Sequence, residues 1–84
     1  MFYTYLLKSK KDKMLYLGST NNLRARLILH NKGRVTSTAK RVPMEIVYYE
    51  AYKSEKDARV REHNLKLRSN AFRQLKQRIK LSLA

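Results

Sequence analysis

The sequence predicts an α/β (α+β) fold, a small three-stranded antiparallel sheet flanked by three helices in the order ββαβαα. Three observations predict it. Aromatic and β-branched residues concentrate in three short segments, a short polar run separates the first two, and apolar residues recur at helical spacing elsewhere. With 84 residues the chain has room for one modest core, so we expect a single domain over residues 1–84.

The first two strands are expected at residues 2–7 and 14–18, joined by a polar turn over residues 8–13. If the turn is centred between its third and fourth residues, Tyr5 and Tyr16 lie opposite each other in an antiparallel pair. Because cross-strand partners share a sheet face, the two phenols are then expected side by side.

The third strand is expected at residues 45–52, where both faces are largely apolar or aromatic. That pattern suits a central strand covered on both sides. Its tyrosines, Tyr48, Tyr49 and Tyr52, are expected in the core and on the sheet surface rather than as platforms for stacking bases. The preceding residues, 32–43, are read as a basic loop with Gly33 and Pro43.

The first helix is expected to be capped by Thr20 or Asn21 and to run to about residue 30 or 31. Leu23 and Leu27, four residues apart, should point inward. The second helix should start at residue 54, and the third near residue 69 or 70. Their inward stripes are expected to be Ala58, Glu62 and Leu65, then Phe72, Leu75 and Ile79.

Charge is the strongest compositional feature, with 20 Lys and Arg against six acids and a formal net charge of +14. A charge this large destabilises so small a protein by self-repulsion unless a polyanion is present, and nucleic acid is the polyanion that releases counterions on binding. A solubility surface or a lipid-binding segment is the alternative. A lipid-binding helix concentrates its cations opposite one apolar face, whereas here they run from Lys8 to Lys80.

The absence of cysteine excludes disulfides, zinc–thiolate clusters and thiol nucleophiles. No apolar run approaches the ~20 residues needed to cross a bilayer, and no signal peptide is recognised. We therefore expect a cytoplasmic protein with no membrane partner and no small-molecule cofactor.

Arg26 and His30 lie four residues apart on the first predicted helix and so share one of its faces. Together with two phenols, they favour a phosphate-handling site. Each residue also has an ordinary structural role: Tyr16 can pack in a strand, Arg26 can be a solvated cation, and His30 can serve the helix dipole. Glu62 can pair with Lys66, although its place on an apolar stripe favours burial near the sheet.

Tyr3-Thr4-Tyr5 and Tyr16-Leu17-Gly18, followed by Arg26, His30 and Glu62, resemble the motifs of the GIY-YIG nuclease family. The resemblance covers nearly the whole chain. It is closest to small stand-alone bacterial members, which are related to the N-terminal nuclease domain of an excinuclease and to homing endonucleases. Tyr3 and Thr4 replace the glycine and isoleucine of the first motif, but strand alternation still lets Tyr5 point into the site.

The resemblance implies metal-dependent hydrolysis of phosphodiester bonds in DNA. It implies that Tyr16 activates the attacking water, with Tyr5 beside it, and that Arg26 binds the scissile phosphate. His30 is then expected to orient a phenol, and Glu62 to hold the divalent metal. We further expect Glu62 to face the sheet side that bears both phenols.

Elementary chemistry agrees with those roles. A phenol with a pKa near 10 is a poor base at neutral pH unless nearby cations lower it, and Arg26, His30 and a metal are expected to supply that field. Because six scattered acids do not suggest a two-metal site, one Mg²⁺ or Mn²⁺ is the consistent reading. Contacts with nucleic acid are assigned to Gly18, Arg24, Lys40 and Arg41, and Asn70, or else Asn64, is the candidate counterpart of a family asparagine.

Two other functions remain open. A non-catalytic DNA- or RNA-binding module would keep the fold and the charge without cleaving its ligand. An RNA- or ribosome-associated basic protein fits the charge but leaves the tyrosine, Arg26, His30 and Glu62 pattern unexplained.

Overall fold

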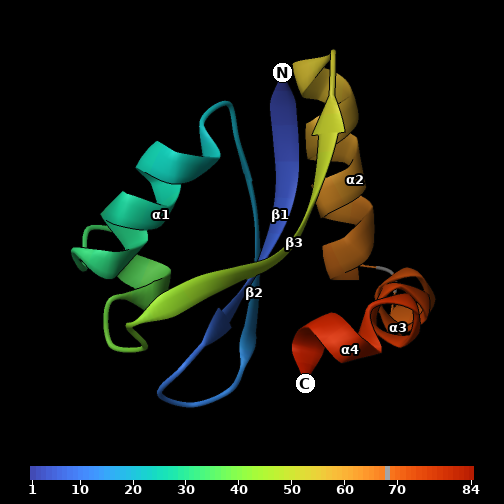
Figure 1. Cartoon of the computed structure of the whole chain (residues 1–84). Helices are drawn as coiled ribbons and strands as arrows, with labels where there is room; N and C mark the ends of the chain where they lie inside the picture. Colours follow the sequence, from blue (N-terminus) through green and yellow to red (C-terminus); the bar gives the residue numbers. More distant parts are fainter. Residues whose placement is uncertain (68) are drawn as a thin grey trace.

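The structure, a computed structural model, describes residues 1–67 and 69–84. Its strands are β1 (Phe2–Ser9), β2 (Leu15–Thr20) and β3 (Met44–Tyr52). Its helices are α1 (Leu23–Asn31), α2 (Glu55–Leu67), α3 (Ser69–Arg78) and α4 (Lys80–Leu83), with a 3-10 turn η1 (Thr36–Thr38) after α1 (Figure 1). The predicted order ββαβαα is confirmed. The short α4 is an addition, because Ile79 leaves the helical conformation at φ −113 and ψ 24.

The sheet has the order β2-β1-β3, and both neighbours of β1 run antiparallel to it. The prediction that residues 45–52 form the central strand is therefore wrong. In β1 the four consecutive residues 4–7 are buried, so this strand is covered on both faces. β3 alternates instead, and its Tyr49 is 54% exposed.

One face of the sheet carries Tyr5 and Leu7 and is covered by α1 (Figure 1). Leu23 and Leu27 of α1 pack against these two side chains, which confirms that they point inward. Met44, at the start of β3, completes this cluster and is 2% exposed.

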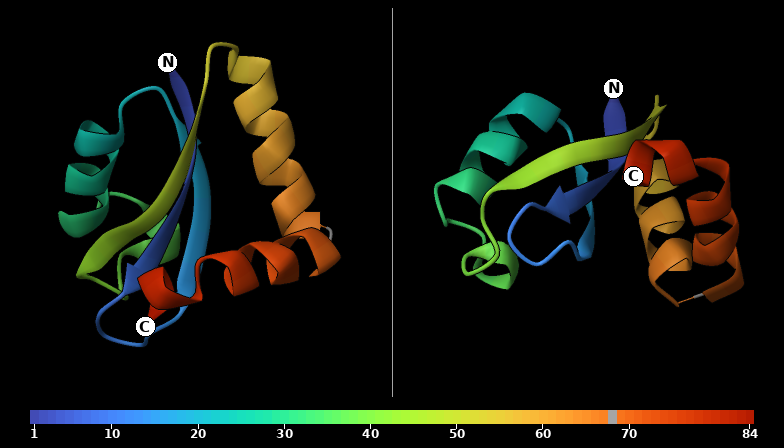
Figure 2. Two further views of the ribbon diagram at one scale, coloured as in Figure 1. Left: turned by 45° about the vertical axis from the view of Figure 1, so that its right-hand side comes forward. Right: turned by 60° about the horizontal axis from the view of Figure 1, so that its bottom comes forward.

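The opposite face carries Leu6 and Leu17 and is covered by α2 and α3 (Figure 2). Leu65 of α2 and Leu75 of α3 are buried there, with Phe72 and Ile79 packed around them. Both predicted helical stripes thus reach the core. Among the described residues, no helix is both long and apolar enough to span a bilayer.

The register of the β1–β2 hairpin differs from the prediction by two residues. Tyr5 is paired with Gly18, and Tyr16 is paired with Leu7. The two phenols still share a sheet face, but as diagonal rather than direct neighbours.

The turn residues explain this register. The Ser9 hydroxyl accepts hydrogen bonds from the backbone N–H groups of Lys11 (3.0 Å) and Asp12 (3.1 Å). The Asp12 carboxylate accepts the N–H of Met14 at 2.8 Å, and Lys13 takes a positive φ of 63. These bonds centre the turn one residue later in the sequence than expected. When the centre of a hairpin turn moves by one residue, the cross-strand partner of each residue moves by two, so Tyr5 faces Gly18 instead of Tyr16.

The N-terminus of α1 is capped by Asn22 rather than by Thr20 or Asn21. The Asn22 side chain accepts the N–H of Ala25 at 3.0 Å. Thr20 lies two positions before this cap, and its hydroxyl accepts the N–H of Asn22 at 3.2 Å. This turn brings α1 back across the sheet face that carries Tyr5 and Leu7, and it directs Arg26 and His30 toward Tyr5.

Candidate active site

Tyr5 lies almost fully inside the protein, with its ring placed over Gly18 on the neighbouring strand. The side chain is 2% exposed. A Cβ on Gly18 would come within 2.3 Å of both Cζ and Oη of Tyr5. Glycine fits this position because any larger side chain would have to displace the phenol from the space that it occupies.

His30 connects Tyr5 to the loop after α1. Its Nε2 lies 3.0 Å from the Tyr5 hydroxyl, and its Nδ1 lies 2.7 Å from the Thr38 hydroxyl. Because Thr38 donates to the carbonyl of Val35 (3.5 Å), its oxygen accepts the Nδ1 proton. Nε2 then accepts the Tyr5 proton, so this series of hydrogen bonds fixes one imidazole tautomer. His30 and Thr38 are both completely buried.

Arg26 completes this hydrogen-bonded set from the same face of α1. Its Nε donates to the Tyr5 hydroxyl at 3.4 Å. Within residues 1–67 and 69–84, its two terminal nitrogens have no hydrogen-bond partner, and the side chain is half-buried. The guanidinium is thus held at one edge while its other edge can meet an anion.

Tyr16 also packs against the His30 ring. The two rings pack edge to face with centroids 5.1 Å apart, and the corresponding distance from Tyr5 to His30 is 6.0 Å. Tyr16 is half-buried, and its hydroxyl makes no hydrogen bond within the described part of the chain. The two phenols therefore differ: Tyr5 is locked, and Tyr16 is free to bind a ligand or water.

The charge state of this cluster differs from the expectation. Burial, followed by the positive charge of Arg26, lowers the pKa of His30 below its usual 6.5, so the imidazole is neutral at neutral pH. Burial also raises the pKa of Tyr5 above 10.0, and the hydrogen bond and charge of Arg26 only partly oppose this. The prediction that His30 lends positive charge to a phenol is therefore wrong, and of the two side chains it is Arg26 that does so.

Glu62 lies on α2, which covers the face opposite α1, so it does not share the face of Tyr5 and Tyr16 as we expected. Its side chain is 21% exposed, and its carboxylate pairs with Lys66 at 2.9 Å. It is still close enough to both Tyr5 and Arg26 for its charge to contribute, as the smallest of several causes, to their raised pKa values. Glu62 thus lies on the other face of the sheet, in a pocket that Ser19 and Thr20 of β2 also line.

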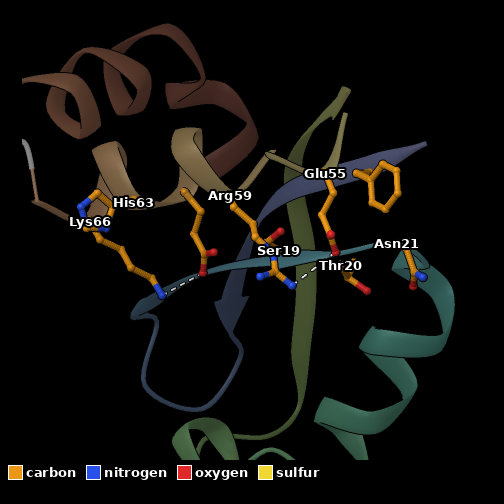
Figure 3. A pocket seen from close by; sticks show the side chains of 9 residues that line it. Ser19, Thr20, Asn21, Glu55, Arg59, His63 and Lys66 are labelled. Carbon is orange, nitrogen blue, oxygen red and sulfur yellow. Dashed lines mark hydrogen bonds and ion pairs between the residues drawn. The ribbon is translucent and has the colours of Figure 1, made fainter. Parts of the chain in front are cut away.

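This polar pocket, of about 540 Å³, lies between α2 and β2. Figure 3 shows Lys66 and Arg59 reaching from α2 toward β2, with Ser19 and Thr20 on the strand below them. Glu62 lines the same pocket. No group of three or more His, Cys, Asp or Glu side chains gathers anywhere in the described residues. A metal here would have one carboxylate from the protein, and water and substrate oxygens would complete its shell.

The residues assigned to nucleic-acid contacts have different surroundings. Arg24 and Lys40 are exposed. Arg41 pairs with Asp12 at 2.8 Å, which ties the loop to the hairpin turn. Gly18 is buried beneath Tyr5. That Arg24 and Lys40 contact nucleic acid stays a prediction. Gly18 and Arg41 have structural roles in this fold that explain these residues without a nucleic-acid contact.

Asn70 lies exposed on α3 and accepts a hydrogen bond from Arg73 at 2.8 Å. It belongs to the α2–α3 side of the sheet, remote from α1. Thr38 is the site residue that sequence reasoning missed. Thr38 fits the family resemblance, but it was given no role in the site, because it lies in the basic loop and no periodicity relates it to His30, eight positions earlier.

The chain is similar to known proteins over most of its length. The GIY-YIG catalytic domain matches residues 1–80. A UPF0213 protein of Clostridium perfringens is 42% identical over 67 residues, which are 79% of this chain and 71% of that protein. A UPF0213 protein of Staphylococcus haemolyticus is 40% identical over 65 residues (76% and 78%), and one of Pediococcus acidilactici is 38% identical over 71 residues (81% and 71%). No solved structure matches the chain. Because the match to the GIY-YIG catalytic domain spans residues 1–80 of the 84-residue chain, the chain belongs to the GIY-YIG family.

Proposed function

We propose that this protein is an endonuclease that hydrolyses phosphodiester bonds in DNA with one divalent cation, Mg²⁺ or Mn²⁺. The observation that carries the proposal is the hydrogen-bonded set of Arg26, Tyr5 and His30, with an unpaired phenol, Tyr16, beside it. Membership of a family described as a catalytic domain supports the same class of reaction.

Arg26 is the group that binds the scissile phosphate. Its Nε is fixed by Tyr5, and its terminal N–H groups are oriented before any substrate arrives. Donors held in place in this way need no reorganisation when charge shifts on the phosphoryl oxygens, which is why they favour the transition state.

Tyr16 is the better of the two phenols for activating water. Tyr5 is 2% exposed, and its hydroxyl already donates to His30. The Tyr16 hydroxyl is unpaired in the described residues and lies at the edge strand, where a water can reach it. Tyr5 and His30 are then positioning residues, which hold Arg26 and the Tyr16 ring.

Glu62 is the residue that would hold the cation. One carboxylate fits Mg²⁺ when water and phosphate oxygens fill the remaining positions. When bound, the cation would stabilise negative charge on the phosphoryl oxygens. Without the cation, Lys66 pairs with Glu62 and neutralises its charge. We therefore expect the cation to bind weakly until DNA is present.

The rival is a DNA- or RNA-binding module that cleaves nothing. Two observations favour it. Glu62 is already paired with Lys66, and the described part of the chain contains no cluster of three or more possible metal ligands. The two functions share the charge of +14, so binding alone does not separate them.

Arg26→Ala separates them. Losing one of 20 cations removes at most about one phosphate contact from binding, whereas removing a preorganised donor typically lowers the rate ~10²–10³-fold. Arg26→Lys should restore only part of the rate, because an ammonium lacks the planar fork. The matched control is Arg73→Ala, which removes an exposed cation on the far side of the sheet.

The measurements are single-turnover nicking of plasmid and branched DNA with Mg²⁺ or Mn²⁺, and a binding isotherm at one salt concentration. Glu62→Ala is run in parallel and should also lose nicking. If Arg26→Ala nicks as fast as the Arg73→Ala control, the activity does not come from this site. If the wild type nicks no DNA form with either metal, the binding module is the better description.

A further inference from the structure

One aromatic side chain of the sheet is left uncovered by the helices. Tyr49 of β3 is 54% exposed. The neighbouring tyrosines of the same strand, Tyr48 and Tyr52, turn to the opposite face, where both donate to Glu50. An exposed aromatic side chain in a strand offers a flat apolar surface that nothing in the described fold uses.

Tyr49 lies beside the candidate active site. It is the β3 partner of Tyr5, so the two share the α1 side of the sheet. Tyr3, two residues earlier in β1, packs edge to face against it, with ring centroids 5.8 Å apart at 72°. This contact fixes the orientation of the Tyr49 ring and leaves its other surface open.

The spacing suits one nucleotide. The Tyr5 ring extends over Gly18, away from β3, and Arg26 meets its hydroxyl there. Because neighbouring strands lie about 4.8 Å apart, Tyr49 and the Gly18 end of the phenol are separated by roughly 10 Å. A nucleotide whose phosphate contacts Arg26 can place its base over Tyr49, provided that the base is not stacked within a duplex.

We propose that Tyr49, held by Tyr3, stacks on the base of an unpaired nucleotide next to the phosphate bound by Arg26. The inference rests on the proposed function, because it takes nucleic acid as the ligand of this face. The net charge of +14 favours a polyanion over an apolar peptide here. Aromatic side chains beside a basic surface are the usual means of holding single strands. The site therefore prefers single-stranded or locally unpaired nucleic acid to intact duplex.

The test measures binding without cleavage. Fluorescence anisotropy is recorded in EDTA, at one salt concentration, for a labelled single strand and for the duplex of the same sequence. Tyr49→Leu should weaken single-strand binding about 10-fold and duplex binding less than about 2-fold. Tyr49→Phe and Tyr49→Trp should keep the single-strand preference, because a ring remains. The matched control is Tyr52→Leu, the same change on the opposite face, which should leave the preference intact.

A single strand carrying 2-aminopurine supplies a direct readout, since stacking on a ring quenches its fluorescence. Quenching by the wild type and by Tyr49→Phe, lost in Tyr49→Leu, is the expected result. Equal effects of Tyr49→Leu on both DNA forms, or none on either, would overturn the inference. The outcome is independent of nicking: the stacking effect without cleavage refutes only the nuclease, and Arg26-dependent nicking without the Tyr49 effect refutes only the stacking.

Discussion

His30 is kept neutral by its surroundings, and the site depends on that state. The residue is 0% exposed, and its ring accepts a hydrogen bond from the Tyr5 hydroxyl and donates one to the Thr38 hydroxyl. A second ring proton would point at the Tyr5 hydroxyl and place a cation near Arg26. Burial and Arg26 both oppose this, which is why the pKa of His30 is lowered.

The pH dependence of stability should report this histidine. The unfolded chain binds a proton near pH 6.5, and the folded protein binds it only at lower pH. The stabilisation is therefore complete above pH 6.5 and declines as the pH falls toward the lowered pKa, by at most about 1.4 kcal/mol per pH unit. Denaturant unfolding between about pH 5 and pH 7.5 measures it. His30→Gln should flatten the slope, and His63→Gln, at an exposed site, should not. Equal slopes in all three proteins would contradict a neutral buried His30.

Gly18→Ala should destabilise the protein by about 1–3 kcal/mol, because the new methyl group overlaps the Tyr5 ring. The matched control is Gly33→Ala, where no atom lies within 4 Å of the added Cβ and the cost, about 1–2 kcal/mol, comes from a φ of +72. Tyr5→Leu should relieve the Gly18→Ala penalty and leave that of Gly33→Ala unchanged. Additive penalties in the Tyr5→Leu/Gly18→Ala protein, measured by denaturant unfolding, would show that the ring is not the obstacle.

Glu62 is positioned by α2, and the carboxylate of Glu50 on β3 binds this helix through Arg61. Glu50 of β3 accepts from Arg61 of α2 through both oxygens, at 3.0 Å to Nε and 3.0 Å to Nη2, and also from Tyr48 and Tyr52. Although burial alone would raise it, these hydrogen bonds bring the pKa of Glu50 below 4.5. Arg61 directly precedes Glu62, so this contact fixes the rotation of α2 beside β2.

Glu50→Gln should cost about 1–3 kcal/mol of unfolding free energy, because a half-buried Arg61 loses its charge partner. The Glu50 side chain is 17% exposed, whereas Glu55, which pairs with Arg59 at 3.3 Å, is 55% exposed. Glu55→Gln is therefore the control and should cost less than about 0.5 kcal/mol. We expect Glu50→Gln also to slow nicking. Similar unfolding midpoints for the two variants would mean that Glu50 does not fasten α2.

The elements were largely predictable because their signals are local. Leu23 and Leu27, or Arg26 and His30, share a helix face whatever the rest of the chain does. The hairpin register was not predictable, because it depends on hydrogen bonds to the Ser9 side chain. The place of Glu62 was not predictable either, since the helical stripe that contains it does not say which face of the sheet α2 covers. The prediction that β3 is the central strand was wrong because it took the tyrosines on both faces of this strand as a sign that both faces are covered. Tyr49 is exposed instead, and β3 is an edge strand.

At the scale of the whole molecule, the site is assembled from both layers across one sheet edge. Arg26 and His30 come from α1, Tyr16 from β2, and Glu62 from α2 on the other face (Figure 2). The protein measures 28 × 25 × 21 Å and carries a charge of +14. Because the Debye length is about 10 Å at 0.1 M salt, many of its cations repel one another below that concentration. Nucleic acid lying along the site would relieve this repulsion.

Binding to duplex DNA should therefore weaken steeply with salt. Each phosphate contact contributes about −0.9 to the slope of log K against log salt. With phosphates about 3.4 Å apart along a strand, the longest dimension of 28 Å spans about eight of them, so we expect a slope between about −3 and −7. Single strands should give a shallower slope, about −0.7 per contact. Isotherms from low to high NaCl measure both slopes, with anionic vesicles as the competing surface. A flat response, or tighter binding to vesicles than to DNA at equal salt, would exclude nucleic acid as the partner, because a charge this concentrated cannot bind phosphates without releasing their counterions.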